Sequence, residues 1–157
     1  MPLMADITYR RAVHEDIAAL VEMRAAFLAE VADADPTDPL LTGALRRYFS
    51  STIPSGEFVA FLAAVDRRIV ATSGLVYHRQ PPSAGNLLGV EAYIMNMYTL
   101  PAWRGRGIAS VLLKKLVAEA QKSKIRRIRL HALARATPLY SRAGFISTEG
   151  EMKLDLA

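Results

Sequence analysis

The sequence predicts an α/β protein with a mixed sheet, in the element order β-α-α-β-β-β-α-β-α-β. Apolar residues recur at helical spacing over residues 14–32 and 104–122, whereas residues 57–65 form an apolar, strand-like run. Two further strand-like segments, 91–100 and 126–132, flank the second of these helices, which is the arrangement of a parallel βαβ unit. The chain of 157 residues shows no repeat or dividing linker, so one domain over 1–157 is expected.

The first elements are a short strand over residues 7–10 and two helices. The first helix is expected from about His14 to Ala32, with acidic residues in its first turn. Its apolar face consists of Ile17, Leu20, Val21, Leu28 and Val31. Asp38 followed by Pro39 predicts the start of the second helix, because Asp is a favoured N-cap and Pro suits the first helical position.

Three strands are expected next. The run 57–65 and residues 69–77 are separated by the short segment 66–68, which predicts a hairpin. Residues 79–90 contain two prolines and two glycines and are interpreted as a loop. The strand 91–100 follows and ends at Pro101.

The C-terminal part begins with the clearest helix, 104–122. Its apolar stripe repeats every four residues, at Ile108, Leu112, Leu116 and Ala120. A strand over 126–132 and a short helix over 137–143, stopped by Gly144, are expected next. The tail alternates apolar and charged residues from Met152 to Leu156, which predicts a last strand.

Composition narrows the function. Residues 1–100 carry a net charge of −3 and residues 101–157 a net charge of +8, so the C-terminal part should attract an anion. The chain has no cysteine, and its histidines, His14, His78 and His131, are far apart, so no metal site is expected. No leader-like or membrane-spanning apolar segment is evident, so a cytoplasmic protein without a membrane partner is expected.

The segment most informative about chemistry is the turn over residues 104–107, Arg-Gly-Arg-Gly, between a strand and a long helix. The first amides of a helix lack partners and the helix dipole adds positive charge, so this turn predicts an anion site. A dinucleotide-binding fingerprint fits poorly, because Ser110 stands where it needs Gly or Ala. A P-loop is absent. Which of Arg104 and Arg106 faces the ligand stays open.

In this context, residues 104–109 resemble the acetyl-CoA motif of the Gcn5-related N-acetyltransferases (GNAT), Arg/Gln-x-x-Gly-x-Gly/Ala. A strand ending in Met97-Tyr98-Thr99-x-Pro101 precedes it at the spacing found in that family. Residues 139–145, Leu-Tyr-Ser-Arg-Ala-Gly-Phe, are similar to a second family signature, Leu-Tyr-x-x-x-Gly-Phe. The resemblance extends over essentially the whole chain, because the order of elements also matches.

The resemblance implies a GNAT-like fold whose central sheet is splayed between strands 91–100 and 126–132. It also implies acetyl-CoA as the acyl donor. The residues implied to bind acetyl-CoA are Met97, Tyr98, Thr99, Arg104, Gly105, Arg106, Gly107, Ile108, Ala109, Ser110 and Tyr140. Leu133 departs from the family pattern, since many relatives have Asn there, so a side-chain contact to the pantetheine is expected to be missing.

Acetyl transfer to an amine needs a base for the ammonium proton and an acid or hydrogen-bond donor for the departing sulfur. Tyr140 is the predicted donor, with packing as the alternative role. Glu91 is the candidate base, directly or through water, with a solvated carboxylate as the alternative; His131 is a further candidate. Tyr93 and Asn96 are predicted to contact the amine substrate, with bridging of the sheet as the alternative role of Asn96.

Two other function classes stay open beside the acetyltransferase. One is a basic nucleic-acid-binding module, although interleaved aromatics and a helix-turn-helix pattern are missing, so no nucleic acid is expected. The other is an acetyl-CoA-binding relative without catalysis. The acceptor, a small-molecule or protein amine, is not identified by the sequence. The acidic residues near position 35 hint at a cationic acceptor, and a homodimer is left open.

Overall fold

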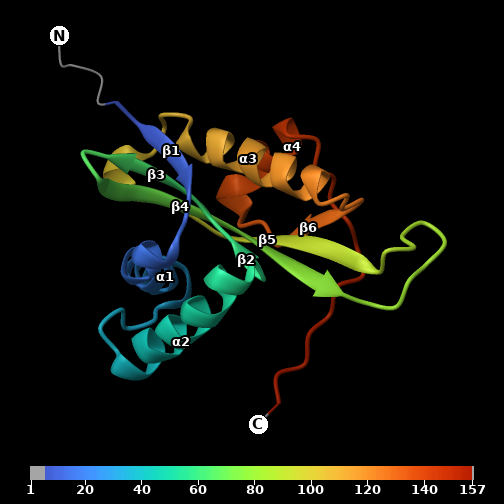
Figure 1. The fold of residues 1–157 in the computed structure, drawn as a ribbon, viewed down its shortest axis with the longest axis horizontal. Helices are drawn as coiled ribbons and strands as arrows, with labels where there is room; N and C mark the ends of the chain where they lie inside the picture. The colour runs from blue at the N-terminus through green and yellow to red at the C-terminus, as the bar shows by residue number, and fades with distance from the viewer. Residues whose placement is uncertain (1–5, 157) are drawn as a thin grey trace.

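The computed structural model describes residues 6–156 as a mixed sheet of six strands covered by helices on both faces (Figure 1). Helices α1 and α2 lie on one face, and α3 and α4 lie on the other. The strands are β1 (Thr8–Arg11), β2 (Phe58–Val59), β3 (Phe61–Val65), β4 (Arg68–Arg79), β5 (Val90–Thr99) and β6 (Ile128–Leu130). The helices are α1 (Ile17–Ala32), α2 (Pro39–Ser55), α3 (Ile108–Lys122) and α4 (Thr137–Arg142). The predicted fold class is confirmed.

The sheet has the order β1-β3-β4-β5-β6, with β2 paired to β4 beside this path. All neighbours are antiparallel except β5 and β6, which run parallel on either side of α3, as the sequence predicts for a βαβ unit. The run 57–65 is divided into β2 and β3 at Ala60, whose carbonyl accepts a hydrogen bond from the Ala12 amide at 2.9 Å. One expected strand therefore serves two neighbours.

The hairpin between β3 and β4 turns at Asp66 and Arg67, which have φ angles of 48° and 66°. Positive φ at both central residues is the mark of a tight hairpin turn whose twist matches that of the strands. The predicted hairpin is confirmed.

Apolar packing on the two faces of the sheet fixes where the helices lie. On the α1 and α2 face, Leu20 and Phe49 pack with Phe58 in one buried cluster. On the other face, Leu113 and Leu116 of α3 belong to a second buried cluster with residues of β4 and β5. Because both faces of the central strands are covered, β4 and β5 form a rigid support for the segments at their ends.

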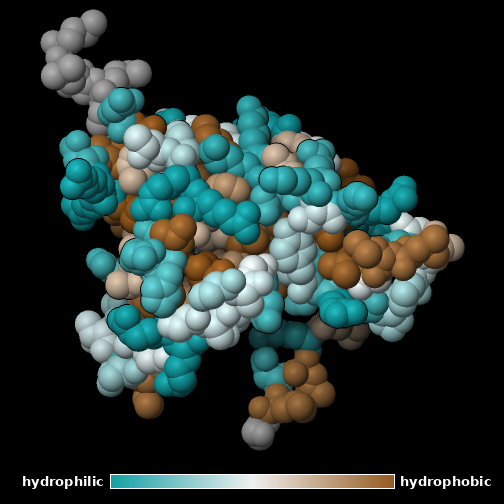
Figure 2. Space-filling view, in the orientation of Figure 1, coloured by the Kyte–Doolittle hydropathy of each residue, from teal (hydrophilic) through white to brown (hydrophobic). Residues whose placement is uncertain are grey.

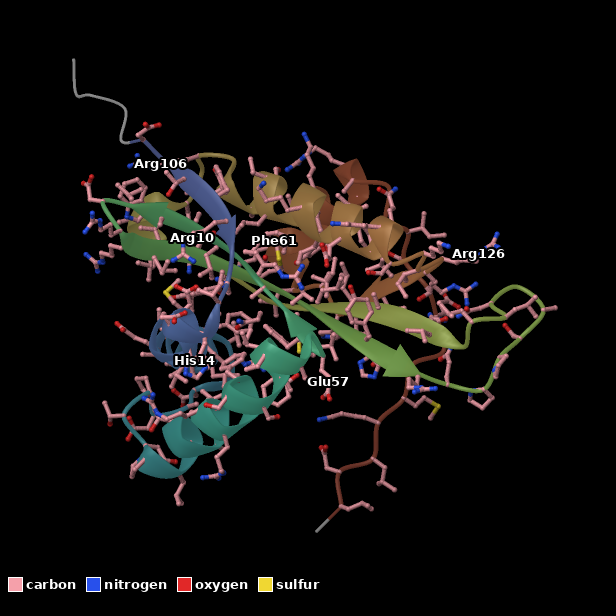
Figure 3. The ribbon with its side chains drawn as sticks, in the orientation of Figure 1. Arg10, His14, Glu57, Phe61, Arg106 and Arg126 are labelled. Atoms are coloured by element: carbon pink, nitrogen blue, oxygen red, sulfur yellow. The ribbon has the colours of Figure 1, made fainter. Side chains whose placement is uncertain are left out.

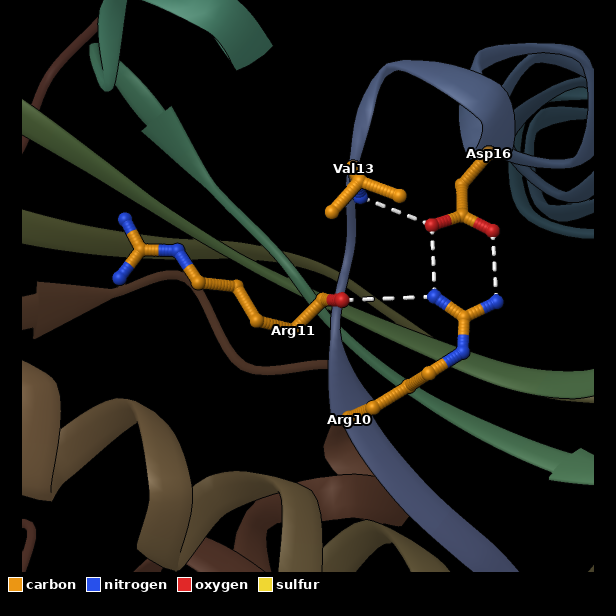
Figure 4. A network of polar contacts seen from close by, with 4 residues as sticks. All are labelled: Arg10, Arg11, Val13 and Asp16. Carbon is orange, nitrogen blue, oxygen red and sulfur yellow. Dashed lines mark hydrogen bonds and ion pairs between the residues drawn. The ribbon is translucent and has the colours of Figure 1, made fainter.

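The corner between β1 and α1 is held by an arginine–carboxylate pair (Figure 4). Both terminal nitrogens of Arg10 donate to the Asp16 carboxylate at 2.7 Å, and the Val13 amide donates to the same group at 2.8 Å. These donors lower the pKa of Asp16, the Arg10 hydrogen bond being the main cause. The pair sets the direction in which α1 leaves the sheet.

Two expectations need correction. The long helix begins at Ile108 rather than Arg104, because a short 3-10 turn at Pro101–Trp103 and the left-handed glycines come first. The last strand expected over residues 152–156 is not formed; residues 143–156 have no regular structure. A strand needs a neighbouring edge to pair its backbone groups, and in Figure 1 the C-terminal tail leads away from the sheet.

Among residues 6–156, no helix combines the length and apolar character needed to cross a membrane.

Candidate functional site

The turn between β5 and α3 is built from two glycines in the left-handed region. Gly105 has φ 75° and Gly107 has φ 77°, a backbone conformation that side-chain-bearing residues rarely adopt. A Cβ added at either position would meet no atom within 4 Å, so the turn is open on the side where a side chain would stand. A ligand can therefore approach the backbone of this turn closely.

The backbone amides of this turn and of the first helical residues form a candidate anion-binding site. Among the described residues, no carbonyl or side-chain group accepts a hydrogen bond from the amides of residues 105–110. No side chain makes a capping hydrogen bond at Gly107, the N-cap of α3. The first hydrogen bond of the helix runs from Val111 to the Gly107 carbonyl at 3.2 Å. Free amides at the start of a 15-residue helix combine with its dipole to favour a phosphate.

The two arginines of the turn lie beside it and are held by different partners. Arg104 donates to the Thr99 carbonyl at 3.0 Å and forms an ion pair with Glu30 of α1 at 2.7 Å. Arg106 lies over the Trp103 ring, with its guanidinium carbon 4.6 Å from the ring centroid. Trp103 thus packs at the mouth of the helix as the support of an arginine.

Glu30 joins two arginines at this mouth. It pairs with Arg104 at 2.7 Å and with Arg135, in the 3-10 turn before α4, at 2.9 Å. The two guanidinium groups, with Arg104 as the main cause, lower the pKa of Glu30 to about 2. Glu30 is therefore ionised at neutral pH and competes with any anionic ligand for these arginines.

The basic run near residue 126 lies elsewhere. Figure 3 shows Arg106 and Arg126 at opposite ends of the layer that contains α3. A helix of 15 residues is about 22 Å long, so one phosphate group cannot contact both. The basic C-terminal part is therefore divided into two separate clusters, and its expected anionic partner stays a prediction. Only its first arginines and Arg135 lie near the turn.

Strand β5 is paired on both sides at its start and on one side only at its end. Its parallel pairing with β6 covers residues 92–94 and stops at Ile94 and Leu130. Beyond Ile94, β5 keeps β4 as its partner while the chain after β6 departs into the turn before α4. This is the predicted splay. It leaves the side of residues 95–99 that faces away from β4 without a partner strand, over a length of about 16 Å at 3.3 Å per residue.

Asn96 lies within this open half and distorts the strand. Its φ of 60° marks a bulge, at which the register with β4 shifts between Thr72 and Gly74. The side chain is 3% exposed, and neither its amide nitrogen nor its oxygen has a hydrogen-bond partner within the described chain. An unpaired buried amide costs roughly 1–3 kcal/mol, and Asn96 lines neither of the two cavities described below.

The three residues after the bulge point to different sides. Met97 contacts the clusters on the α3 face. Tyr98 packs against Phe27 of α1 on the other face, with the rings tilted and their centroids 5.7 Å apart. The Thr99 carbonyl is taken by Arg104. Of the predicted binding residues of β5, Met97 is the one that the structure brings into the cluster of Tyr140.

Tyr140 stands on α4, buried between the sheet and an open groove. Its side chain is 7% exposed and packs edge-on against Phe145, with ring centroids 5.8 Å apart. It also lines a groove of about 1210 Å³ that follows the outer side of β6. Burial raises the pKa of Tyr140, and neither Arg135 nor Arg142 lowers it. The hydroxyl therefore stays protonated at neutral pH.

Glu91 is the second residue of β5, at the closed end of the splay. It is 6% exposed and accepts from Arg129 at 2.7 Å and from Arg127 at 3.2 Å. These arginines lower its pKa, Arg129 being the main cause. A lowered pKa keeps Glu91 ionised but makes it a weaker base. Its role as the base stays a prediction.

Tyr93 connects the two cavities. It lines the groove beside β6 and also a pocket of about 320 Å³ whose wall includes Glu91 and His78. The His78 ring packs edge-on against Tyr93, with centroids 5.9 Å apart. His131 is exposed just beyond β6 and lines the groove. Several predicted side chains therefore lie near the splay, on two different walls.

Comparisons with known proteins agree with this geometry. A model of the acetyltransferase (GNAT) family matches residues 22–145. A predicted acetyltransferase with acetyl-CoA from Clostridium acetobutylicum is 33% identical, with a TM-score of 0.88 and 96% of each chain covered. The chain belongs to the GNAT acetyltransferase family.

Other similar structures extend the comparison. A GCN5-related N-acetyltransferase from Ralstonia eutropha JMP134 is 26% identical, with a TM-score of 0.84, 96% of this chain covered and 99% of the other. A glucosamine-6-phosphate N-acetyltransferase from Arabidopsis thaliana shares the GNAT fold at 13% identity, with a TM-score of 0.74 and coverages of 97% and 99%. A comparison with curated proteins found no match.

Two features of this GNAT protein were not predicted from its sequence. The first is the link from Glu30 to the turn, which joins residues 74 positions apart. The second is the pair of arginines on Glu91, which come from the basic run after α3. The sequence gives no signal for either pairing beyond opposite charge. Leu133, at the position of the family's Asn, caps the turn before α4 through its backbone.

Proposed function

We propose that the protein is an N-acetyltransferase that moves the acetyl group of acetyl-CoA to a primary amine by direct attack in a ternary complex. The observation that carries the proposal is the row of unpartnered amides over residues 105–110, at the start of α3 and beside the open half of β5. These amides suit a diphosphate, and the unpaired length of β5 suits the extended pantetheine arm of acetyl-CoA.

In this proposal, acetyl-CoA supplies an acyl group already activated as a thioester. The amides of Gly105, Arg106, Gly107, Ile108, Ala109 and Ser110 hold its diphosphate. Arg104 and Arg106 add positive charge at the mouth. The backbone of Met97, Tyr98 and Thr99 borders the arm; only the Thr99 carbonyl is engaged by a side chain, that of Arg104.

Tyr140 is proposed to hydrogen-bond the departing sulfur. With its pKa raised by burial, its hydroxyl keeps its proton at neutral pH and donates rather than accepts. Full transfer of the proton to a thiolate of pKa near 8.5 is uphill, so the hydrogen bond is the main contribution. Packing of Tyr140 with the cluster of Met97 supports a position near the splay.

The amine is proposed to meet the acyl group near Asn96 and Tyr93. Tyr93 borders both cavities, and the buried, unpartnered Asn96 amide would orient a polar substrate after a local opening uncovers it. An alkylammonium of pKa near 10 must lose a proton, which costs about 4 kcal/mol at pH 7. Glu91, acting through water, is the proposed base, weakened by its two arginines.

The test is release of free thiol from acetyl-CoA in the presence of a broad panel of amines. We expect turnover with at least one amine and an about 10²-fold lower kcat in the Tyr140→Phe variant, since only the hydroxyl is removed. Tyr77→Phe is the matched control, because the Tyr77 hydroxyl contacts Ser123 at 3.2 Å, in the turn after α3.

The outcomes separate the remaining function classes. Absence of acetyl-CoA binding by calorimetry would overturn the proposal. Binding of acetyl-CoA without turnover on any amine would identify a relative that has lost catalysis. Equal losses in the Tyr140→Phe and Tyr77→Phe variants would reduce Tyr140 to a packing residue.

A further inference from the structure

One arginine stands in the middle of the apolar face of α1. Arg24 lies three or four residues from Leu20, Val21 and Leu28, so helical geometry places it on their face. The side chain is half-buried, and α1 packs with α2 against one face of the sheet (Figure 1). Figure 2 shows the outer surface of this helix pair as mainly hydrophilic. Arg24 is therefore a cation on the side of the helix that is otherwise apolar.

No anionic partner compensates the Arg24 guanidinium. Within residues 6–156, Arg24 takes part in none of the ion pairs. Of the carboxylates on the same helix, Glu22 is exposed and Glu30 is engaged by two other arginines. Burial lowers the pKa of Arg24, while the nearby Tyr48 raises it to a smaller extent. The charge thus loses water without gaining an opposite charge, which costs stability.

The surroundings of Arg24 are suited to an anionic group. Its guanidinium carbon lies 5.5 Å from the centroid of the Phe27 ring, a contact that leaves the N–H groups free to donate. Burial raises the pKa of Tyr48 on α2, with a smaller contribution from Glu57, so the Tyr48 hydroxyl keeps its proton at neutral pH. A guanidinium fork and a hydroxyl donor together match the oxygens of a carboxylate or phosphate.

Aromatic contacts connect this cation to the open half of β5. Phe27 packs against Tyr98, with ring centroids 5.7 Å apart, so Arg24 is two contacts away from the strand that borders the proposed acyl group. The amides proposed to hold the diphosphate begin α3, which lies on the opposite face of the sheet. An anion at Arg24 therefore belongs to the second substrate and not to acetyl-CoA.

We propose that the acceptor amine carries an anionic group, a carboxylate or a phosphate, which Arg24 binds together with the Tyr48 hydroxyl. The inference rests on the proposed function and names the chemical class of its acceptor. Because Phe27 separates the cation from Tyr98, a chain of several atoms separates the amine from the anionic group. Binding such a substrate explains a charge that the fold itself does not compensate.

The acidic residues near position 35 do not contradict an anionic acceptor. Asp35 accepts hydrogen bonds from the backbone and the hydroxyl of Thr37, at 2.8 and 2.6 Å. Asp38 accepts from the Leu40 amide at 2.9 Å and so caps α2. These carboxylates stabilise the connection between α1 and α2, which accounts for them without a cationic substrate.

Amines that differ only in the group at the far end test the acceptor class. The set is pentylamine, cadaverine, aminocaproate and aminopentyl phosphate, with shorter and longer members of each series. The native protein should show at least about tenfold higher kcat/KM for one of the anionic amines than for the alkylamine of equal length. The anionic series that is preferred identifies the anion as carboxylate or phosphate.

Variants of Arg24 and Tyr48 assign the preference to these side chains. Arg24→Met keeps the length of the side chain and should lower kcat/KM for the anionic amine by about 10- to 100-fold, with pentylamine changed less than about twofold. Arg24→Lys should recover part of the loss, and Tyr48→Phe should lower kcat/KM by about three- to tenfold. Arg46→Met, on exposed α2, is the control, and the affinity for acetyl-CoA should be unchanged in all four variants.

Thermal unfolding gives a readout that does not depend on acetyl transfer. The preferred anionic amine should raise the Tm of the native protein and of Arg46→Met but not that of Arg24→Met, because only the folded state binds it. Without ligand, Arg24→Met should unfold at the same or a higher urea concentration than the native protein, since an uncompensated charge is removed.

The outcomes separate this inference from the proposed function. Turnover of pentylamine without preference for, or stabilisation by, any anionic amine overturns the inference and leaves the proposed function standing. Stabilisation by an anionic amine that depends on Arg24, without turnover of any amine, supports the anion site and overturns the proposed function. A less stable Arg24→Met with unchanged kcat/KM for every amine would reduce Arg24 to a packing residue and overturn the inference.

Discussion

Two glutamates, each between two arginines, stand at opposite ends of β5 and differ in what they do. Glu91 lies near the start of the strand, next to the residues that pair with β6, and its arginines belong to the segment that includes β6. Glu30 lies on α1 near the other end, where β6 is absent, and its arginines belong to the turn over residues 104–107 and to the turn before α4. The Glu91 side chain is 7% exposed and that of Glu30 is 26% exposed.

The comparison shows that the same kind of ion-pair cluster has different roles at the two ends of β5. Around Glu91, the arginines close the parallel pairing and hold the base of the splay. Around Glu30, they stand beside amides that lack partners, so an anionic ligand can take over one of them. In this interpretation the arginines of the first cluster hold β5 and β6 together without binding the anionic ligand, whereas those of the second cluster can exchange Glu30 for that ligand.

The largest expected effect comes from reversing one charge in each cluster. Arg104→Glu should weaken acetyl-CoA binding by about 10- to 100-fold, because one charge-assisted hydrogen bond is worth about 1.5–3 kcal/mol and the new charge repels phosphate. Arg129→Glu, the matched change at the other cluster, should alter the affinity by less than about threefold while lowering the stability.

Calorimetric titration with acetyl-CoA and urea unfolding of both variants make this measurement. If Arg129→Glu weakens acetyl-CoA binding as much as Arg104→Glu does, the two clusters are not distinct in function, and the ligand extends over the far end of α3.

A smaller effect is expected from Glu91→Gln. The free energy of unfolding should fall by about 1 kcal/mol at pH 7, because the arginines that Glu91 pairs with are half exposed. Since folding lowers the pKa of Glu91, this stabilisation is present above the ordinary pKa near 4.5 and is lost as the pH falls through the lowered value. The gap between native protein and variant should therefore narrow below about pH 4.

The same variant tests the base. A fall of 10²-fold or more in kcat at neutral pH, with acetyl-CoA affinity unchanged, would identify Glu91 as the base. An unchanged kcat with reduced stability would restrict it to holding β5 and β6 together.

The fold was predictable wherever local pattern decides structure. The stripe from Ile108 to Ala120 predicted α3, and Asp38-Pro39 predicted the start of α2, where the Asp38 carboxylate accepts from the Leu40 amide at 2.9 Å. Alternation in the tail predicted a strand that does not form, because a strand also needs an edge beside it. Periodicity records which faces are apolar, and it carries no information on whether a partner strand is present.

The site was predictable in its backbone and less so in its side chains. Gly105 and Gly107 predicted an open turn, because the left-handed backbone conformation that they adopt is favoured by glycine itself and not by distant residues. The bulge at Asn96 and the partners of Arg104 depend on segments distant in sequence, which spacing does not encode. Charge asymmetry predicted an anionic partner but did not separate the two basic clusters, which lie at opposite ends of the layer that contains α3.

The smallest expected effect tests the cluster of Glu30 and its two arginines. Glu30→Gln keeps the size of the side chain and removes the charge that competes for Arg104, so acetyl-CoA binding should strengthen by about two- to fivefold, the worth of an exposed ion pair. Because the pKa of Glu30 is about 2, the ratio of affinities should stay constant from pH 6 to 9, and it should shrink in high salt. Glu22→Gln, an exposed change on the same helix, is the control. Weaker binding in Glu30→Gln would mean that Glu30 holds Arg104 in its binding position, which would make this cluster as structural as the one at Glu91.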